Sequence, residues 1–338
     1  MKKRKDGRYL KQITINGKAI SFYSSAKTES KAIKDIERQL LNYRIKQENG
    51  KTFEEVAEEW RNEHFKTLAY NSIKSMAPAL ERAIEEFGSA YIKQITAKDV
   101  NSFIIKFAKK GFGFKSVTNQ LQIVRQVLSF GMLEGYVDYN VAIAVKVPKN
   151  LPRTHRTTPE PQVIKIIKSN TSAPFALFSL FALYTGCRRG ELLALQYKDI
   201  DFINKEINIT KSVYYISNKP YIKKPKTEAG NRKVILLPEL EKHIPKLNPD
   251  EYIFSHNGEM LTDKKFQLLW RKYCKDLSID ITPHQLRHYY ATRLYELNID
   301  EKSAQDLLGH ADIQTTRNIY THISDEKRKL TYRQLQGF

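Results

Sequence analysis

Two breaks in the sequence pattern limit the possible folds most, because they divide the 338 residues into three segments. The first break is Asn49-Gly50-Lys51, where a helical pattern stops. The second runs from Pro148 to Pro161 and combines four prolines with basic side chains, which is typical of a stiff, exposed connector. A chain of this length can bury two or three separate cores. The sequence therefore predicts three domains, at residues 1–48, 52–147 and 154–338.

The first segment carries a strong β-hairpin signal. Two alternating runs, Tyr9–Ile15 and Lys18–Tyr23, flank Asn16-Gly17, and Asn-Gly is a favoured two-residue hairpin turn. A second turn at Asp6-Gly7 can add a third strand, and apolar residues at helical spacing from Thr28 to Tyr43 predict a helix across the sheet. With 13 Lys and Arg against 5 Asp and Glu, this small sheet could enter a DNA major groove. The alternative is a solvated accessory domain.

The second segment has a helical pattern. Thr52 and Glu55 form a capping-box signal at its start, and Thr96 and Ser116 are candidate caps of later helices. We expect four or five helices and few strands between residues 52 and 147. Its lysines and Arg125 could grip DNA, although scattered cations on helices are also typical of a solvated face.

Composition favours a polyanionic partner. The chain has 57 Lys and Arg against 37 Asp and Glu, a formal net charge of +20, so DNA or RNA is a better candidate than a membrane. The alternative is an ordinary basic protein. Cys187 and Cys274 match no zinc spacing, which suits a reducing cytoplasm. No run of about 18 apolar residues is present, so we expect a cytoplasmic protein without membrane spans.

The third segment opens with an apolar run, Phe175–Leu183, that predicts a buried helix ending at Thr185-Gly186. Arg188 follows at the start of another helix, where backbone N–H groups and a cation favour an anion. A β-rich stretch then contains Glu206–Thr210 and Val213–Tyr215. Lys226 lies in the turn between this stretch and a further strand at residues 232–237, so we expect it on a hairpin. A lysine at a hairpin tip is by itself typical of a solubilising edge residue.

Two further helix starts carry candidate site residues. Thr282-Pro283 precedes a helix on which His284 and Arg287, three residues apart, share a face. A short helix closes with Gly309-His310. Tyr320 lies in the helix that follows and is one of 19 tyrosines, so nothing local distinguishes it.

The order of these residues carries more information than any one of them. Thr185-Gly186-Cys187-Arg188-Arg189-Gly190-Glu191-Leu192, Lys226, His284-x-x-Arg287, Gly309-His310 and Tyr320 together resemble the tyrosine recombinase, or phage integrase, family. In that family Thr-Gly-x-Arg-x-x-Glu-Leu opens the site, and a tyrosine about ten residues after Gly-His closes it. The resemblance covers residues 154–323. It implies a multidomain, mainly α fold with a mixed α+β catalytic domain.

The other two segments resemble the family through their architecture. The helical middle segment is similar to a core-site-binding domain. The N-terminal sheet is similar to the arm-site-binding domain of integrases from phages and conjugative elements.

The resemblance implies a site-specific recombinase that cuts and rejoins DNA through a 3′-phosphotyrosyl intermediate. It assigns Tyr320 as nucleophile, Arg188 and Arg287 as phosphate ligands, Lys226 as general acid for the 5′ oxygen, His284 as the proton-handling partner and His310 as a further donor. Neither a metal nor another cofactor is expected. Glu191 is expected to orient its neighbours, and Cys187 to fill the core.

The implied partners are double-stranded DNA at core and arm sites, further subunits in a homotetramer, and an excisionase or host DNA-bending protein. The C-terminal tail could pack on a neighbouring subunit or on its own domain. A mobile-element integrase is preferred over a chromosome-dimer resolvase because the resolvase would not need the N-terminal sheet. Two further hypotheses are a topoisomerase-like enzyme that uses the same chemistry and a non-catalytic DNA-binding regulator, against which the complete set of site residues argues.

Overall fold

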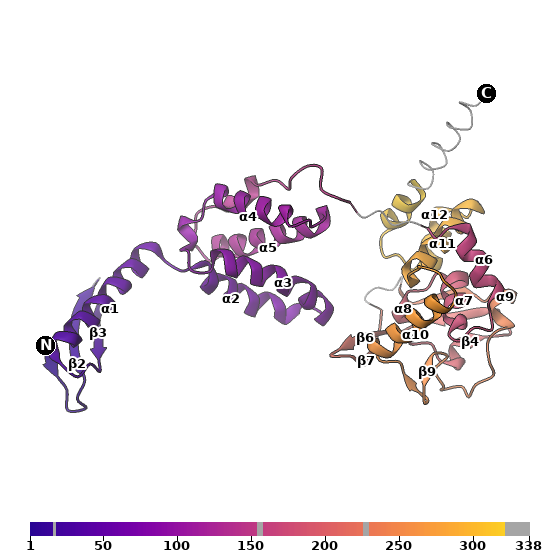
Figure 1. Cartoon of the computed structure of the whole chain (residues 1–338), viewed down its shortest axis with the longest axis horizontal. Helices are drawn as coiled ribbons and strands as arrows, with labels where there is room; N and C mark the ends of the chain where they lie inside the picture. Colours follow the sequence, from indigo (N-terminus) through magenta and orange to yellow (C-terminus); the bar gives the residue numbers. More distant parts are fainter. Residues whose placement is uncertain (16–17, 154–157, 226–229, 322–338) are drawn as a thin grey trace, which may run out of the picture. The chain divides into compact units, whose positions relative to one another are not determined.

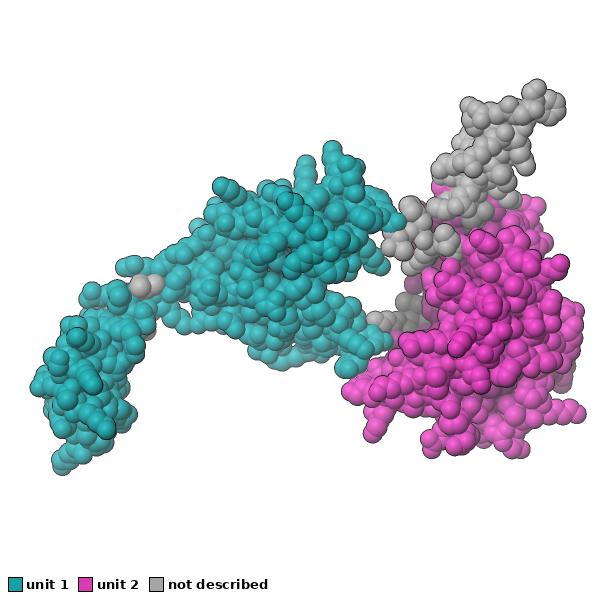
Figure 2. Space-filling view, viewed as in Figure 1, with its two compact units in different colours: residues 1–154 teal, residues 155–338 magenta. Residues whose placement is uncertain are grey.

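The computed structural model describes residues 1–15, 18–153, 158–225 and 230–321. The chain forms two compact units, residues 1–154 and 155–338 (Figure 2). The predicted Asn16-Gly17 turn, Lys226 and the tail beyond Thr321 lie outside the described residues.

A three-stranded antiparallel sheet opens the first unit (Figure 1). Its strands are β1 Lys2–Lys3, β2 Tyr9–Ile15 and β3 Lys18–Ser24. Helix α1, Glu29–Asn49, covers one face and buries Ala32 and Ile36 against Tyr9 and Phe22. The predicted sheet and helix are confirmed, although the helix continues six residues beyond Tyr43 and ends where Gly50 adopts a φ of 77°.

Four α-helices form the rest of the described part of this unit, around a core separate from that of the sheet. They are α2 Phe53–His64, α3 Tyr70–Phe87, α4 Ala97–Lys109 and α5 Phe114–Leu133, with 3₁₀ turns η1 Phe65–Thr67, η2 Ile92–Gln94 and η3 Val141–Ala144. The predicted capping box at Thr52 begins α2, and the predicted cap Thr96 begins α4, where it also forms a capping box, with Asp99. The prediction for Ser116 was wrong, because α5 begins earlier, at Phe114, after Gly113 as N-cap.

The second unit combines helices with short strands, as the resemblance implied. The helices are α6 Pro161–Ser169, α7 Ala176–Thr185, α8 Arg189–Leu192, α9 Pro238–Glu241, α10 Asp263–Asp276, α11 Pro283–Glu296 and α12 Glu301–Leu308, with the 3₁₀ turn η4 Tyr197–Asp199. The strands are β4 Ile200–Asp201, β5 Glu206–Ile209, β6 Ser212–Ile216, β7 Lys219–Lys223, β8 Arg232–Ile235, β9 Ser255–His256 and β10 Glu259–Met260. Residues 313–321 are also helical.

The apolar helix α7 lies at the centre of this unit, as its sequence predicted. Phe178 is fully buried, and its ring packs edge-on against Phe254, Phe266 and Trp270. Aromatic side chains remove a large apolar area from water, so this cluster supplies much of the unit's stability. It anchors α7 in the core of this unit.

One strand pairing of the second unit joins strands that are not consecutive along the chain. Strand β8 pairs with β5, while β6 pairs with β7, a strand at Lys219–Lys223 that sequence reasoning missed. The described strands on either side of the Lys226 segment, β7 and β8, therefore belong to different sheets rather than to one hairpin. The pair Ser217-Asn218, with φ of 45° and 72°, makes the tight β6–β7 turn.

None of the helices in the described part of the chain is both long enough and apolar enough to cross a membrane.

Candidate active site

The end of α7 is shaped by one glycine. Gly186 adopts a left-handed φ of 62°, and a Cβ atom there would lie 2.3 Å from the Tyr290 ring. Glycine therefore satisfies both the conformation and the close approach of α11. Its carbonyl accepts a 2.7 Å hydrogen bond from Arg287. The Thr-Gly pair thus joins α7 to a predicted site residue.

Arg188 is the N-cap residue of α8 and spans to the end of α12. Its Nη1 donates to Glu191 at 2.7 Å, and its Nη2 donates to the Gly309 carbonyl at 2.9 Å. The side chain stays 45% exposed, so part of the guanidinium faces solvent. A guanidinium whose two Nη atoms are held by hydrogen bonds, and which is partly exposed to solvent, is suited to bind an anion.

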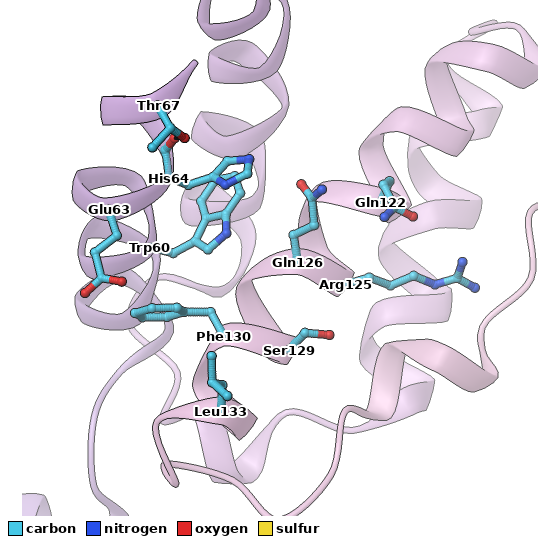
Figure 3. A pocket seen from close by; sticks show the side chains of 10 residues that line it. All are labelled: Trp60, Glu63, His64, Thr67, Gln122, Arg125, Gln126, Ser129, Phe130 and Leu133. Carbon is cyan, nitrogen blue, oxygen red and sulfur yellow. Dashed lines mark hydrogen bonds between the residues drawn. The ribbon is translucent and has the colours of Figure 1, made fainter. Parts of the chain in front are cut away.

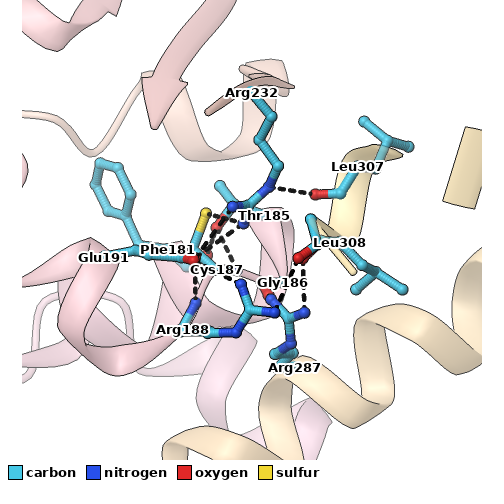
Figure 4. Close-up of polar contacts among 11 residues, drawn as sticks. Phe181, Thr185, Gly186, Cys187, Arg188, Glu191, Arg232, Arg287, Leu307 and Leu308 are labelled. Atoms are coloured by element: carbon cyan, nitrogen blue, oxygen red, sulfur yellow. Dashed lines mark hydrogen bonds and ion pairs between the residues drawn. The ribbon is translucent and has the colours of Figure 1, made fainter. Parts of the chain in front are cut away.

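Arg287 is buried and lies beside Arg188. It donates to Gly186 and, at 2.6 Å, to the Leu308 carbonyl, which immediately precedes the Gly309 carbonyl used by Arg188 (Figure 4). Burial lowers the pKa of the Arg287 guanidinium to about 9, and the charge of Arg188 acts in the same direction. The charged form of Arg287 is therefore disfavoured by burial and by its cationic neighbour, and a bound anion would favour it.

Glu191 and Arg232 connect this pair to the sheet. Arg232, at the start of β8, donates to both carboxylate oxygens of Glu191, at 3.2 and 2.9 Å. Burial by itself would raise the pKa of Glu191, but the hydrogen bond and charge of Arg232, with Arg188, outweigh it and hold the pKa at about 2. Glu191 is thus an ionised orienting group, in line with the expectation from its sequence position.

Sequence reasoning missed Arg232. The signal was present, because Arg232 and Val234 fall on the same face of an alternating strand and Val234 is buried. An arginine on the buried face of a strand requires a carboxylate partner. Cys187, expected in the core, is indeed buried there, with its Sγ 3.5 Å from Nη2 of Arg232.

The two candidate histidines lie in contrasting surroundings. His310 is buried directly after Gly309, and its Nδ1 is 2.9 Å from the Thr316 hydroxyl. His284 is exposed in the first turn of α11, one helical turn before the buried Arg287. The three-residue spacing therefore puts one member of the pair in solvent and the other in the interior.

Tyr320 lies in the helix at 313–321 and is 7% exposed. Its hydroxyl donates to the Ile299 carbonyl at 3.2 Å, and its ring packs edge-on against Tyr295. It shares a small core with Leu308, whose carbonyl binds Arg287. Burial raises the pKa of Tyr320 to about 12, with Asp300 and Glu301 adding to the rise, so the phenol is protonated at neutral pH.

These contacts divide the predicted residues into groups. Arg188 and Arg287 meet at α12, and His310 follows on the same segment, whereas Tyr320 makes its hydrogen bond to Ile299 and none to either guanidinium. Lys226 lies outside the described residues. Within the described ranges, no group of three His, Cys, Asp or Glu side chains is arranged to hold a metal ion.

A pocket of about 360 Å³ opens beside Arg188. It is lined by Arg188, Glu191, Lys211, Ser212, Lys223, Pro225, Gly230, Gly309 and Ala311. Lys211 and Lys223 add positive charge that sequence reasoning did not assign to the site. A cleft with this lining suits a phosphodiester rather than an apolar ligand.

A larger pocket, of about 470 Å³, lies in the first unit and is lined by α2, η1 and α5 (Figure 3). The Trp60 and His64 rings stack along it, with centroids 4.8 Å apart. None of the five described candidate residues belongs to its lining, so size alone does not identify the site.

Comparisons with known proteins show which protein family the second unit resembles. Residues 157–327 match the model of the phage integrase family. The chain is 31% identical to tyrosine recombinase XerD of Listeria innocua, over 70% of this chain and 81% of that protein. It is 28% identical to the ICEBs1 integrase of Bacillus subtilis, over 70% of each chain.

The fold is also similar to a solved structure of the Tn1549 transposon integrase in complex with a circular intermediate DNA. The TM-score is 0.69 at 20% identity, and the match covers 83% of this chain and all of that one.

Proposed function

The chain belongs to the phage integrase family and is a tyrosine recombinase, a DNA-cleaving and DNA-rejoining enzyme, and on this premise we propose that it integrates and excises a mobile genetic element. The observation that supports this is the sheet of residues 2–24 with its helix α1, in a segment rich in lysine and arginine. A second DNA-reading module is useful to an enzyme that must bring distant sites together. Similarity to the ICEBs1 integrase agrees with this role.

The proposed reaction conserves the energy of the phosphodiester bond. The Tyr320 phenol oxygen attacks the scissile phosphorus, its proton passes to a base, and the 5′ oxygen leaves with a proton from a general acid. A 3′-phosphotyrosyl bond replaces the broken bond, and attack by another 5′ hydroxyl reverses the step. No oxidant and no nucleotide are needed.

We assign the phosphate-binding roles from the contacts of the arginines, and the proton-transfer roles from the positions that match the family's motif. Arg188 and Arg287 stabilise the charge that develops on the non-bridging oxygens, since they bind adjacent carbonyls at the end of α12 and Arg188 lines the charged pocket. His310 adds a donor from the segment after α12. Lys226 is the proposed general acid, and His284 the proposed partner of the nucleophile.

The hydrogen bond of Tyr320 to Ile299 must be broken for attack. In the described conformation its oxygen bonds to a backbone carbonyl and its ring is buried, so we propose that the helix at 313–321 moves relative to α11 and α12 before the reaction. Binding of DNA and of a neighbouring subunit is the proposed source of the energy for this change.

We propose that the active assembly is a homotetramer on two duplexes. Exchange between two duplexes breaks four strands, and each chain supplies one nucleophile, so four chains are required. The described four-helix region would hold the core site, the N-terminal sheet would hold arm sites, and an excisionase or host DNA-bending protein would join them.

The test is a pair of measurements on DNA from the ends of the element. Full-length protein should form a covalent adduct on a nicked crossover site and should bind a second, distant sequence. Deletion of residues 1–48 should preserve the adduct and remove binding to the second sequence. Unchanged two-site binding after the deletion would contradict the arm-binding role.

A chromosomal resolvase is the second candidate, because the similarity to XerD is at least as high as that to the ICEBs1 integrase. A resolvase would recombine two copies of one short site without arm sequences. If the chain relaxes supercoiled DNA as a monomer at any sequence, it is a topoisomerase-like enzyme instead.

A further inference from the structure

Three successive backbone carbonyls at the end of α12 are each bound by a different arginine. The carbonyl of Leu307 accepts from Nε of Arg232 at 2.8 Å, that of Leu308 accepts from Arg287, and that of Gly309 accepts from Arg188. The last carbonyls of a helix have no partner within the helix and carry its negative dipole end. The end of α12 is therefore a common anchor for three guanidiniums.

Arg232 differs from Arg188 because it does not line the pocket, and from Arg287 because its guanidinium binds the buried carboxylate of Glu191. Its side chain is 5% exposed, and it is not among the residues that line the cleft beside Arg188. Its Nη1 and Nη2 bind the Glu191 carboxylate, which also accepts from the backbone N–H and Nη1 of Arg188. Any effect of Arg232 on a substrate must therefore pass through these neighbours.

Arg188 is held by two groups, and Arg232 contacts one of them and a residue close to the other. One group is Glu191, and the other is the Gly309 carbonyl, two residues after the Leu307 carbonyl that Arg232 holds. Without Arg232, the buried carboxylate would have Arg188 as its remaining arginine partner, so it would draw that guanidinium away from a phosphate. The end of α12 would also lose one of its three anchors.

We propose that Arg232 is a positioning residue for strand cleavage, which fixes Glu191 and the end of α12 so that Arg188 presents its guanidinium to the scissile phosphate. This inference rests on the proposed role of Arg188 and on the reaction assigned above. Arg232 lies outside the sequence motifs by which the chain resembles the family.

The experiment compares three nicked duplexes that carry the crossover site. The scissile linkage is a normal phosphodiester, a methylphosphonate that lacks one anionic oxygen, or a phosphorothiolate whose 5′ sulfur leaves without a general acid. Covalent adduct formation is followed in a single turnover with the full-length chain. Adducts with the wild-type protein, and none with Tyr320→Phe, establish the proposed function before Arg232 is tested.

For Arg232→Met we expect adduct formation on the phosphodiester to slow by about 10- to 100-fold, while DNA affinity changes by less than about threefold. On the methylphosphonate the defect should shrink to about threefold or less, because a neutral linkage does not need an aligned guanidinium. The matched control is Lys233→Met, the next residue of β8, which is exposed and pairs with Glu206. It should cleave at the wild-type rate.

Three results would overturn the proposal. The first is a phosphodiester rate within about threefold of wild type. The second is a defect equally large on the methylphosphonate, which would assign the loss to general destabilisation. The third is relief by the phosphorothiolate alone, which would place the effect on protonation of the leaving group.

A second pair of variants keeps the test decisive if Arg232→Met does not fold. Arg232→Lys retains the charge but cannot bind Glu191 and Leu307 with one planar group, and it should show a smaller defect with the same substrate dependence. Glu191→Gln combined with Arg232→Met removes both buried charges. Its defect should be larger than that of Glu191→Gln alone, because the Leu307 contact is also lost, but smaller than the product of the two single defects. Fully additive defects would show that Arg232 acts independently of Glu191.

Discussion

The hydroxyl of Tyr320 donates a hydrogen bond of 3.2 Å to the backbone carbonyl of Ile299. In this conformation the side chain that we propose as nucleophile contributes to the local packing of the helix at 313–321. Its structural and chemical roles can be separated, because a phenylalanine retains the ring contacts and loses only the hydroxyl.

We predict that Tyr320→Phe abolishes covalent adducts on a nicked crossover site, while DNA affinity stays within about twofold and stability falls by about 1 kcal/mol. Gel analysis under denaturing conditions measures the adduct, and urea unfolding measures stability. Tyr273→Phe is the control, since its buried hydroxyl also makes one hydrogen bond, to Ser179. It should lose comparable stability and still form the adduct. An adduct that survives Tyr320→Phe would move the nucleophile elsewhere.

The paired carbonyl contacts of Arg287 lead to a second prediction. A lysine has a single ammonium group and cannot bridge Gly186 and Leu308 while also offering a planar fork to a phosphate. Arg287→Lys should therefore slow single-turnover cleavage by about 100- to 1000-fold. Arg293→Lys, an exposed position on the same helix that pairs with Glu296, should cleave normally. Equal rates for both variants would exclude Arg287 from the site.

The contribution of Glu191 to the free energy of unfolding should depend on pH in the acid range. Its pKa is about 2 in the folded chain, against 4.5 for an unperturbed glutamate, so its contribution to stability is present above pH 4.5 and is lost as the pH falls through 2. Between pH 5 and pH 3 the difference in unfolding free energy between wild type and Glu191→Gln should shrink by about 2 kcal/mol.

Urea unfolding at the two pH values measures this difference. Glu206→Gln, which affects an exposed pair with Lys233, should differ from wild type by less than about 0.5 kcal/mol at both. A Glu191→Gln difference that is independent of pH would mean that Arg232 and Arg188 do not hold the carboxylate ionised.

Local sequence rules predicted much of the fold, because they act over a few residues. The capping boxes at Thr52 and Thr96 begin helices, and Gly186 and Gly309 end them in the left-handed conformation. The spacing of apolar residues predicted the buried helix α7. Ser116 failed as a cap because Gly113 supplies the N-cap of α5, and helix boundaries are the least certain part of such reasoning.

Contacts between distant segments could not be predicted in the same way. The hydrogen bond from Arg232 to the Leu307 carbonyl joins residues that are 75 positions apart, and no local sequence pattern predicts it. The pairing of β6 with β7 was missed because Lys219–Lys223 is short and contains Pro220, which disfavours a strand. Motif order indicated which residues belong to the site, but the burial of Tyr320 depends on how the last helices pack.

The outer face of the N-terminal sheet gives the last prediction. Tyr9 and Phe22 are buried under α1, so their strand neighbours point the other way, and Gln12 pairs with Ser21 on that face. Arg4 and Arg8 lie within 5.5 Å of the Tyr23 ring on the same face. Polar side chains flanked by guanidiniums are suited to read base edges while cations hold the phosphates.

We therefore expect Gln12→Ala to weaken binding to the arm sequence by about 1–3 kcal/mol and to leave binding to random DNA unchanged. Arg8→Gln should weaken both and lower the slope of log affinity against log salt by about 1, since one phosphate contact is lost. Lys34→Gln, at an exposed position of α1 on the covered side of the sheet, should change neither. These affinities can be measured by fluorescence anisotropy at several salt concentrations. If Lys34→Gln weakens binding and Gln12→Ala does not, the helix rather than the sheet faces the DNA.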